Sequence, residues 1–145
     1  RVEAAVKTVR EHYVVEVIKP VVADLEGVLS ACGVLMLPYC VLENERGTPT
    51  FQIGWEDEDG RVPVEAMSAG EAVLFGAALT LTFAKRSDGI KPILLEADPL
   101  DLENLELVFQ GLTELNHEDV VLVATCASYA TPPNNSGWKT IVFDI

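Results

Sequence analysis

Four segments of the chain have residue types and spacings that can support chemistry. In chain order they are Met67-Ser68-Ala69-Gly70-Glu71, Pro92-Ile93-Leu94-Leu95-Glu96-Ala97-Asp98-Pro99, Leu100-Asp101-Leu102-Glu103-Asn104 and Val121-Leu122-Val123-Ala124-Thr125-Cys126. The first opens a predicted helix, and helix N-termini attract anions. The second is an apolar strand that ends in carboxylates, the third begins another helix, and the fourth is a strand that ends in a small polar pair.

Each of these segments also has a purely structural interpretation. Ser68, followed three residues later by Glu71, is typical of a helix capping box. Acidic residues after a strand are typical of a solvated loop or a helix N-cap, and Asp101 can simply cap the helix that follows it. Thr125-Cys126 can be an ordinary strand end. The order of the four segments along the chain is therefore more informative than any one of them.

The motifs that the sequence lacks exclude several other chemistries. No GxxxxGK[ST] loop occurs, and the nearest imitation, Gly137-Trp138-Lys139-Thr140, has an inserted Trp and no helix after it. The two histidines, His12 and His117, lie on predicted helix surfaces or ends, so we expect neither a zinc site nor a nucleophile triad. The cysteines form no CxxC pair and have apolar neighbours, so we expect reduced core thiols at Cys32, Cys40 and Cys126.

The elements that must position these segments can be predicted from hydrophobic periodicity. Apolar residues recur at helical spacing over residues 3–19, and Pro20 interrupts the pattern before a second helix over residues 21–32. Residues 34–65 favour strands, because apolar and polar residues alternate on both sides of the acidic turn Glu56-Asp57-Glu58-Asp59-Gly60. This pattern predicts a hairpin.

The second half of the chain has a strand–helix–strand rhythm. A helix that is apolar on nearly all sides is predicted over residues 68–86. Short apolar strands at 93–95 and 120–124 flank an amphipathic helix at 101–116, and a last strand is predicted at 140–143. Apolar strands separated by a helix indicate a parallel pair, joined by a right-handed crossover, in a sheet covered on both faces.

The fold class predicted is α/β: a mainly parallel sheet flanked by helices, with a small antiparallel hairpin. The 145 residues suffice for a single domain or lobe, in which residues 1–33 are helical, 34–66 form strands and 67–145 contain the parallel sheet. Asp and Glu number 23 against 10 Lys and Arg, a net charge of −13 that makes the chain alone a poor binder of nucleic acid or of an anionic membrane. No apolar stretch is long enough for a transmembrane helix.

Taken in order, the four segments resemble the C-terminal lobe of an ABC-type ATPase head. The closest members are the coiled-coil class, which contains the SMC family and the double-strand-break-repair ATPases. Met67-Ser68-Ala69-Gly70-Glu71 is similar to that class's LSGGE signature motif, and the strand with Glu96 and Asp98 is similar to its Walker B motif. Leu100-Asp101 resembles the D-loop, and Thr125-Cys126 stands where the switch strand ends in Thr-His.

The resemblance implies a fold context and a set of roles. It covers residues 50–145, makes the helix at 3–19 the place where a coiled coil re-enters the head, and puts the P-loop on a separate N-terminal segment. The implied roles are nucleotide contact for Ser68, Ala69, Gly70 and Glu71, catalysis and Mg²⁺ binding for Glu96 and Asp98, head–head contact for Asp101, and the switch position for Cys126. The nucleotide at the signature would be an ATP held by the partner head.

The sequence departs from the family pattern at three motifs. The D-loop-like Leu100-Asp101 follows Pro99 with fewer residues between than is usual in the family. Aligning Pro99 with the family's Pro places Ala97 at the Mg²⁺-linked Asp and Asp98 at the catalytic Glu, whereas sliding by one residue places Glu96 at the Asp and Ala97 at the Glu. One carboxylate is lost in either register. Cys126 replaces a His, and a thiol is a weaker hydrogen-bond donor. We therefore expect a degenerate site or one half of an asymmetric pair.

The function implied by the resemblance is ATP-gated dimerisation in DNA repair or chromosome processes. ATP and Mg²⁺ are the cofactors expected of the complete head, and this lobe alone is not expected to hydrolyse ATP. The expected partners are the N-terminal P-loop lobe and a second head, with DNA reached only through the complete assembly, no membrane, and a cytoplasmic or nuclear location. Two alternatives remain open: a catalytically inactive ABC-like scaffold or regulator, and a small acidic protein-binding module.

Overall fold

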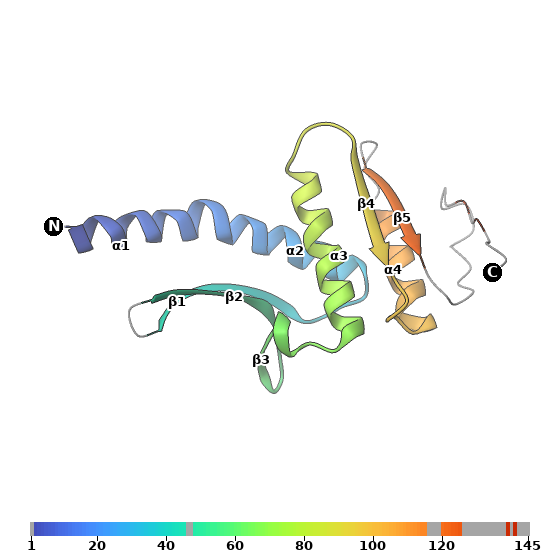
Figure 1. The fold of residues 1–145 in the computed structure, drawn as a ribbon, viewed down its shortest axis with the longest axis horizontal. Helices are drawn as coiled ribbons and strands as arrows, with labels where there is room; N and C mark the ends of the chain where they lie inside the picture. The colour runs from blue at the N-terminus through green and yellow to red at the C-terminus, as the bar shows by residue number, and fades with distance from the viewer. Residues whose placement is uncertain (1, 46–47, 116–119, 126–138, 140, 142–145) are drawn as a thin grey trace.

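The computed structural model describes residues 2–45, 48–115, 120–125, 139 and 141. It contains an N-terminal helical arm, a three-stranded antiparallel sheet and a two-stranded parallel sheet, with one helix standing between the two sheets (Figure 1). The fold is therefore of mixed α/β type, as the sequence predicts.

The N-terminal part is one continuous helical run (Figure 1). It consists of α1 (Val2–Tyr13), the π-helix η1 (Val14–Ile18) and α2 (Lys19–Ala31). Contrary to the prediction, Pro20 does not break the run. It closely follows the wider turn of η1, and the helical run continues past it although Pro20 has no backbone N–H to donate. At Gly33 a φ of 78° ends the run, a conformation that glycine adopts without strain.

The antiparallel sheet contains the predicted hairpin. Its strands pair in chain order: β1 (Leu37–Glu45), β2 (Thr48–Asp57) and β3 (Gly60–Pro63). The acidic turn between β2 and β3 is closed by the Asp57 carboxylate, whose Oδ1 accepts the backbone N–H groups of Asp59 at 2.8 Å and Gly60 at 3.0 Å. Val64, predicted to lie in the strand, is instead in the 3₁₀ turn η2 (Val64–Ala66), because pairing of β3 with β2 ends at Pro63.

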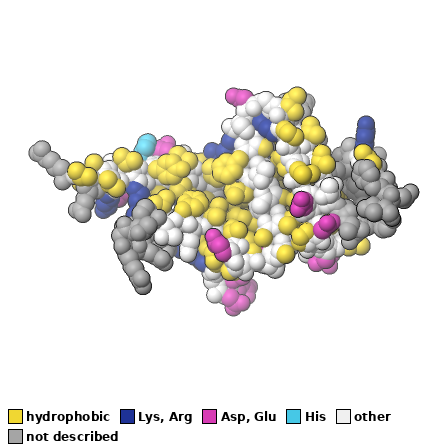
Figure 2. Space-filling view, viewed as in Figure 1, with side chains coloured by type: hydrophobic (Ala, Val, Ile, Leu, Met, Phe, Trp, Pro, Cys, Tyr) yellow, Lys and Arg dark blue, Asp and Glu magenta, His cyan; other side chains and the backbone are white. Residues whose placement is uncertain are grey.

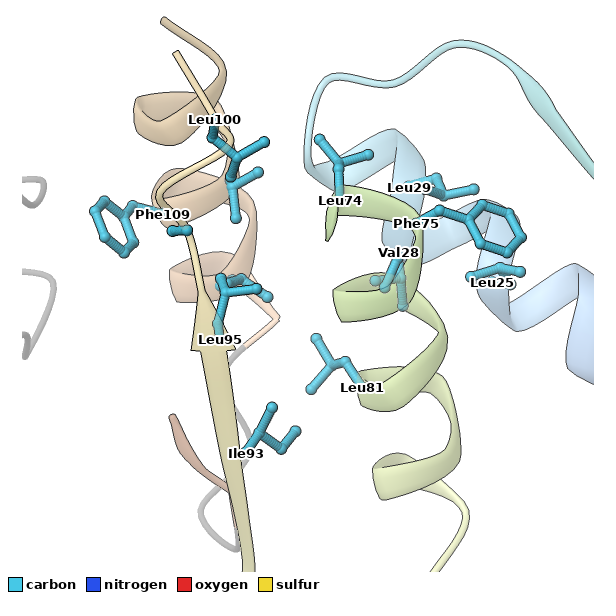
Figure 3. Close-up of a cluster of buried hydrophobic side chains, with 14 of the residues drawn as sticks. Leu25, Val28, Leu29, Leu74, Phe75, Leu81, Ile93, Leu95, Leu100 and Phe109 are labelled. Atoms are coloured by element: carbon cyan, nitrogen blue, oxygen red, sulfur yellow. The ribbon is translucent and has the colours of Figure 1, made fainter. Parts of the chain in front are cut away.

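Helix α3 (Ala69–Lys85) stands at the centre of the fold and is buried on two sides, as its sequence predicts. On one side Phe75 points toward α2, among Leu25, Val28 and Leu29 (Figure 3). The Phe75 ring also meets the edge of the buried Trp55 ring of β2, with 5.8 Å between ring centroids. Such apolar contacts join α2 and the antiparallel sheet to the same helix, α3.

On the opposite side, α3 packs against the parallel sheet. The sheet consists of β4 (Lys91–Glu96) and β5 (Val120–Thr125), with the crossover helix α4 (Leu102–Glu114) between them in the sequence. Ile93 and Leu95 of β4 face Leu81 of α3 (Figure 3). The predicted strand–helix–strand unit is therefore confirmed.

The prediction of a mainly parallel sheet covered on both faces is wrong for the described part of the chain. The parallel sheet has only two strands, so the antiparallel sheet is the larger one. The outer face of the parallel sheet is open: Leu94, Val121 and Val123 are 68%, 52% and 51% exposed. The strand predicted at 140–143 lies outside the described residues except for Ile141, which is exposed. The apolar strand pattern correctly predicted the parallel pairing of β4 with β5, but it does not reveal what covers the second face of that sheet.

Candidate functional site

Three of the four candidate segments meet at one end of the fold. Helix α3 runs antiparallel to β4, so its N-terminus lies beside the carboxyl end of β4 and the start of α4 (Figure 1). The approach is close at Gly70, where a Cβ atom would lie 3.2 Å from the carbonyl oxygen of Pro99 and 3.9 Å from a methyl group of Leu100. The sequence signal for this contact is a glycine in the first turn of a helix, and its packing partner was not predicted.

The N-terminus of α3 carries the capping box that its sequence predicts. The backbone N–H of Glu71 donates to Ser68 Oγ at 3.4 Å, and the backbone N–H of Ser68 donates to Glu71 Oε2 at 2.8 Å. Ser68 and Ala69 are exposed, so the tip of the helix faces solvent rather than the core. No intrahelical carbonyl is available to the N–H groups of Ala69 and Gly70, because such bonds begin only after the first turn.

Pleating separates the residues at the carboxyl end of β4 into two faces. Ile93 and Leu95 are buried, whereas Leu94 and Glu96 of the strand are exposed. In the turn that follows the strand, Ala97 is buried and Asp98 is exposed. Ala97 has no exposed surface, and its N–H donates to the carbonyl oxygen of Thr125 at 2.8 Å. Both carboxylates are therefore exposed, and the residue between them is buried in the core.

The D-loop-like residues form the cap of α4. The backbone N–H of Asn104 donates to Asp101 Oδ1 at 2.9 Å, and its side-chain Nδ2 donates to Asp101 Oδ2 at 3.0 Å. Leu100 is buried and anchors the turn before the cap. Asp101 thus has a structural role as N-cap, one of the two interpretations that the sequence left open.

This end of the molecule is acidic. Residues 62–84 and 92–125 contain no Lys or Arg, although they include Glu71, Glu96 and Asp98. Figure 2 shows acidic side chains over this end of α3 and β4. Two helix N-termini partly offset the negative charge, but they supply only about half an elementary charge each. A phosphate group would therefore need an added cation to bind here.

The same end could offer oxygen ligands to Mg²⁺. In the described part of the chain no group of three or more His, Cys, Asp or Glu residues is arranged to hold a metal ion. Mg²⁺ in nucleotide sites is commonly held by one or two carboxylates together with phosphate oxygens. Glu96 and Asp98, both exposed and two residues apart, fit that requirement but not a closed protein-only metal site.

Two of the cysteines lie in the described residues, and both are free thiols. Cys32 is buried as predicted, and desolvation, with a smaller contribution from the Glu114 carboxylate, raises its pKa from 9.0 to about 11. Cys40 is half-buried, and burial raises its pKa also. These thiols are therefore poor nucleophiles at neutral pH.

The remaining sequence candidates divide between exposed and undescribed positions. His12 is exposed on α1, as predicted. His117 and the switch-position Cys126 lie outside the described residues, as does most of the segment at 137–140. Thr125, the last residue of β5, pairs with Glu96 across the parallel ladder and is exposed.

Comparison with models of known protein families and with curated protein sequences finds no match to this chain. Among the described residues, no helix combines the length and the apolar character needed to cross a membrane. The function must therefore be inferred from the residues and their arrangement.

Proposed function

We propose that this chain is the C-terminal, signature-bearing lobe of an ABC-type ATPase head of the coiled-coil class. In this role it takes part in ATP-gated dimerisation, in DNA repair or chromosome processes. The observation that carries the proposal is the meeting of the signature-like and D-loop-like segments at one solvent-facing end, with Gly70 against Pro99. A random imitation of the motif order would not require these segments to be neighbours in space.

The exposed tip of α3 is suited to contact a phosphate from another molecule. Its first-turn N–H groups lack intrahelical partners, and Ala69 has no side chain that would obstruct an approaching ligand. The Ser68 hydroxyl already accepts the Glu71 N–H, yet its own proton remains able to donate to an anion. These groups are the signature contacts that the proposal requires.

The charge of the site indicates what its partners must bring. With no Lys or Arg in residues 62–84 and 92–125, the negative charge of ATP has to be met by Mg²⁺ and by basic groups from elsewhere. In the proposed head these come from the N-terminal P-loop lobe, and a second head closes on the signature. A net charge of −13 leaves DNA contact to the complete assembly.

The exposed arm favours the coiled-coil class in particular. Val2, Val6, Val9 and Tyr13 recur at steps of four, three and four residues, which is an a/d heptad seam. These side chains are 78%, 61%, 69% and 49% exposed along α1. A second helix packed on this seam would continue a coiled coil out of the head.

An inactive head is a second candidate, and Ala97 favours it. Its side chain is fully buried between the two exposed carboxylates, so neither alignment with Walker B supplies both acidic groups. Removing one charged group from such a site typically costs about 3 kcal/mol of transition-state stabilisation. The head would then bind ATP and dimerise without turning it over.

The dimerisation proposal is tested by placing a charge at the tip of α3 in the complete protein. Ala69→Glu adds a carboxylate that the helix dipole tolerates but that repels a phosphate. Gly76→Glu is the matched control, because Gly76 is exposed on the same helix and a Cβ there meets nothing within 4 Å. Light scattering with Mg²⁺ and a slowly hydrolysed ATP analogue should show at least a tenfold loss of dimer for Ala69→Glu only. Equal dimerisation of both variants would discard the signature role.

Hydrolysis separates the active head from the inactive one. In the complete protein, Asp98→Asn should lower the ATP turnover rate at least tenfold if this carboxylate orients the attacking water. Identical ATP turnover rates for wild type and Asp98→Asn would show that Asp98 has no catalytic role and would favour the inactive scaffold.

A further inference from the structure

Helix α1 (Val2–Tyr13), here called the arm, differs from the rest of the molecule because so little of its surface is covered. Every described side chain of α1 is exposed except that of Arg10, which is half-buried. The first buried side chain of the helical run is Ile18, and α2 then buries Leu25, Val28 and Leu29 in the core. In Figure 1 the arm extends away from α3 and β4, alongside the β1–β2 hairpin. The boundary between the uncovered and the anchored helix therefore falls at residues 14–20.

The helix is irregular at this same boundary. In η1 the hydrogen bonds span five residues instead of four, and the run ends with the Lys19 N–H donating to the carbonyl oxygen of Val14. The next residue, Pro20, has no N–H to donate to a carbonyl in the preceding turn. Prolines and π-bulges are both recognised causes of kinks in helices, and here they are adjacent.

The covered side of the run begins on α1 and continues toward α2. Arg10 and Val14 are half-buried and Ile18 is buried, at steps of four residues. The apolar residues Val9, Tyr13 and Val17 recur at the same spacing and are exposed.

Among the described residues, one hydrogen bond joins the arm to the body. The Arg10 guanidinium donates through Nη2 to the carbonyl oxygen of Leu42 in β1. A hydrogen bond of this kind, partly open to water, is individually weak.

We propose that residues 14–20 are a hinge on which the α1 arm pivots, and that the Arg10–Leu42 contact is the latch that holds the arm against the hairpin. The π turn and Pro20 supply the pivot, and the core contacts of α2 keep the other side fixed. The inference rests on the arm alone and does not depend on the proposed function of the acidic end.

Electron-spin distance measurements test both parts on the full chain. Spin labels introduced through an unnatural amino acid at Thr8 on α1 and Thr80 on α3 leave the native cysteines unmodified, and both positions are exposed. In wild type the distance between the two labels should fall into two populations: one with the arm latched against the hairpin and one with the arm swung away from it. Arg10→Met should raise the swung population at least threefold, whereas Lys7→Met, an exposed control on the same helix, should not.

Backbone exchange tests the pivot. Pro20→Ala restores a donor and should narrow the distance distribution and slow amide exchange at residues 15–20 at least tenfold. Gly27→Ala is the control, because it also raises helix propensity, meets nothing within 4 Å and lies in the anchored part of α2. One narrow distance in wild type would overturn the hinge, as would an unchanged exchange pattern in Pro20→Ala. No response to Arg10→Met would overturn the latch.

Discussion

Gly111 shows how much a single residue decides where two elements can cross. It lies in α4, and a Cβ atom there would be 2.4 Å from the carbonyl oxygen of Ala31 and 2.7 Å from the backbone nitrogen of Cys32. Those atoms are backbone at the end of α2, so they cannot rotate away. Gly111→Ala should therefore destabilise the fold by about 2–3 kcal/mol, as overpacked cores do. Urea unfolding followed by circular dichroism measures it.

Gly76→Ala and Gly27→Ala are the matched controls for Gly111→Ala. Both glycines are exposed within helices, and a Cβ at either meets nothing within 4 Å. Each substitution should raise the free energy of unfolding by up to about 1 kcal/mol, since alanine is the better helix former. If all three variants shift stability in the same direction, the close crossing at Gly111 is wrong.

Cys32 gives the fold a pH dependence of known sign. Its pKa is raised from 9.0 to about 11 in the folded chain, so between these values the unfolded thiol ionises while the folded thiol stays protonated. The neutral buried thiol has its full stabilising effect below pH 9, and that effect is lost as pH rises toward about 11, by about 2–3 kcal/mol.

Cys32→Ala isolates this effect from other groups that titrate in the same range. The difference in unfolding free energy between wild type and Cys32→Ala should shrink by about 2–3 kcal/mol between pH 9 and pH 11. The titration of Lys and Tyr side chains contributes equally to both proteins and therefore cancels in this difference. A difference that stays constant with pH would mean that the thiol is not desolvated.

At the scale of elements, β4 offers two neighbouring leucines in opposite surroundings. Leu95 is 5% exposed and faces α3, whereas Leu94 is 68% exposed on the outer face of the parallel sheet. Leu95→Ala should cost about 2–5 kcal/mol, and Leu94→Ala less than about 0.5 kcal/mol. Thermal unfolding of the two variants makes the comparison. Similar losses would mean that the outer face of β4 is covered in solution.

Element types could be predicted where local chemistry decides them. The Ser68–Glu71 capping box marked the start of α3, and the acidic turn ending in Gly60 marked the β2–β3 hairpin, because each forms its hydrogen bonds within a few residues. Pro20 misled for the complementary reason: proline ends a regular helix, but a preceding π turn let the helical run continue.

The candidate site could be predicted as a set of segments but not as a geometry. Ser68, Asp101 and the carboxylates of β4 were found from residue types and spacing. The contact of Gly70 with Pro99 depends on how α3 packs against β4, which is long-range and leaves no local pattern. Likewise, alternation placed Ala97 in the core only once the register of β4 with β5 was known.

For the whole molecule, the distribution of charge matters more than any ion pair. The net charge is −13, and ion pairs described in the structure, such as Lys7–Glu11, Arg61–Glu56 and Arg86–Asp24, are exposed and individually weak. Salt screens the many repulsions more than it screens these few attractions. Raising NaCl from about 20 mM to about 300 mM should therefore raise the free energy of unfolding by about 1 kcal/mol.

A charge-reversal variant tests whether screening is the cause. Glu58→Lys, in the exposed turn between β2 and β3, reduces the net negative charge without touching the Asp57 hydrogen bonds, so the stabilisation by NaCl should be smaller than in wild type. Glu58→Gln changes the net charge by half as much, so its stabilisation by NaCl should lie between those of wild type and Glu58→Lys. Sucrose at matched osmolality controls for exclusion of solutes from the surface. If all three proteins gain equally from NaCl, exclusion of ions from the surface rather than screening of charge repulsion causes the stabilisation.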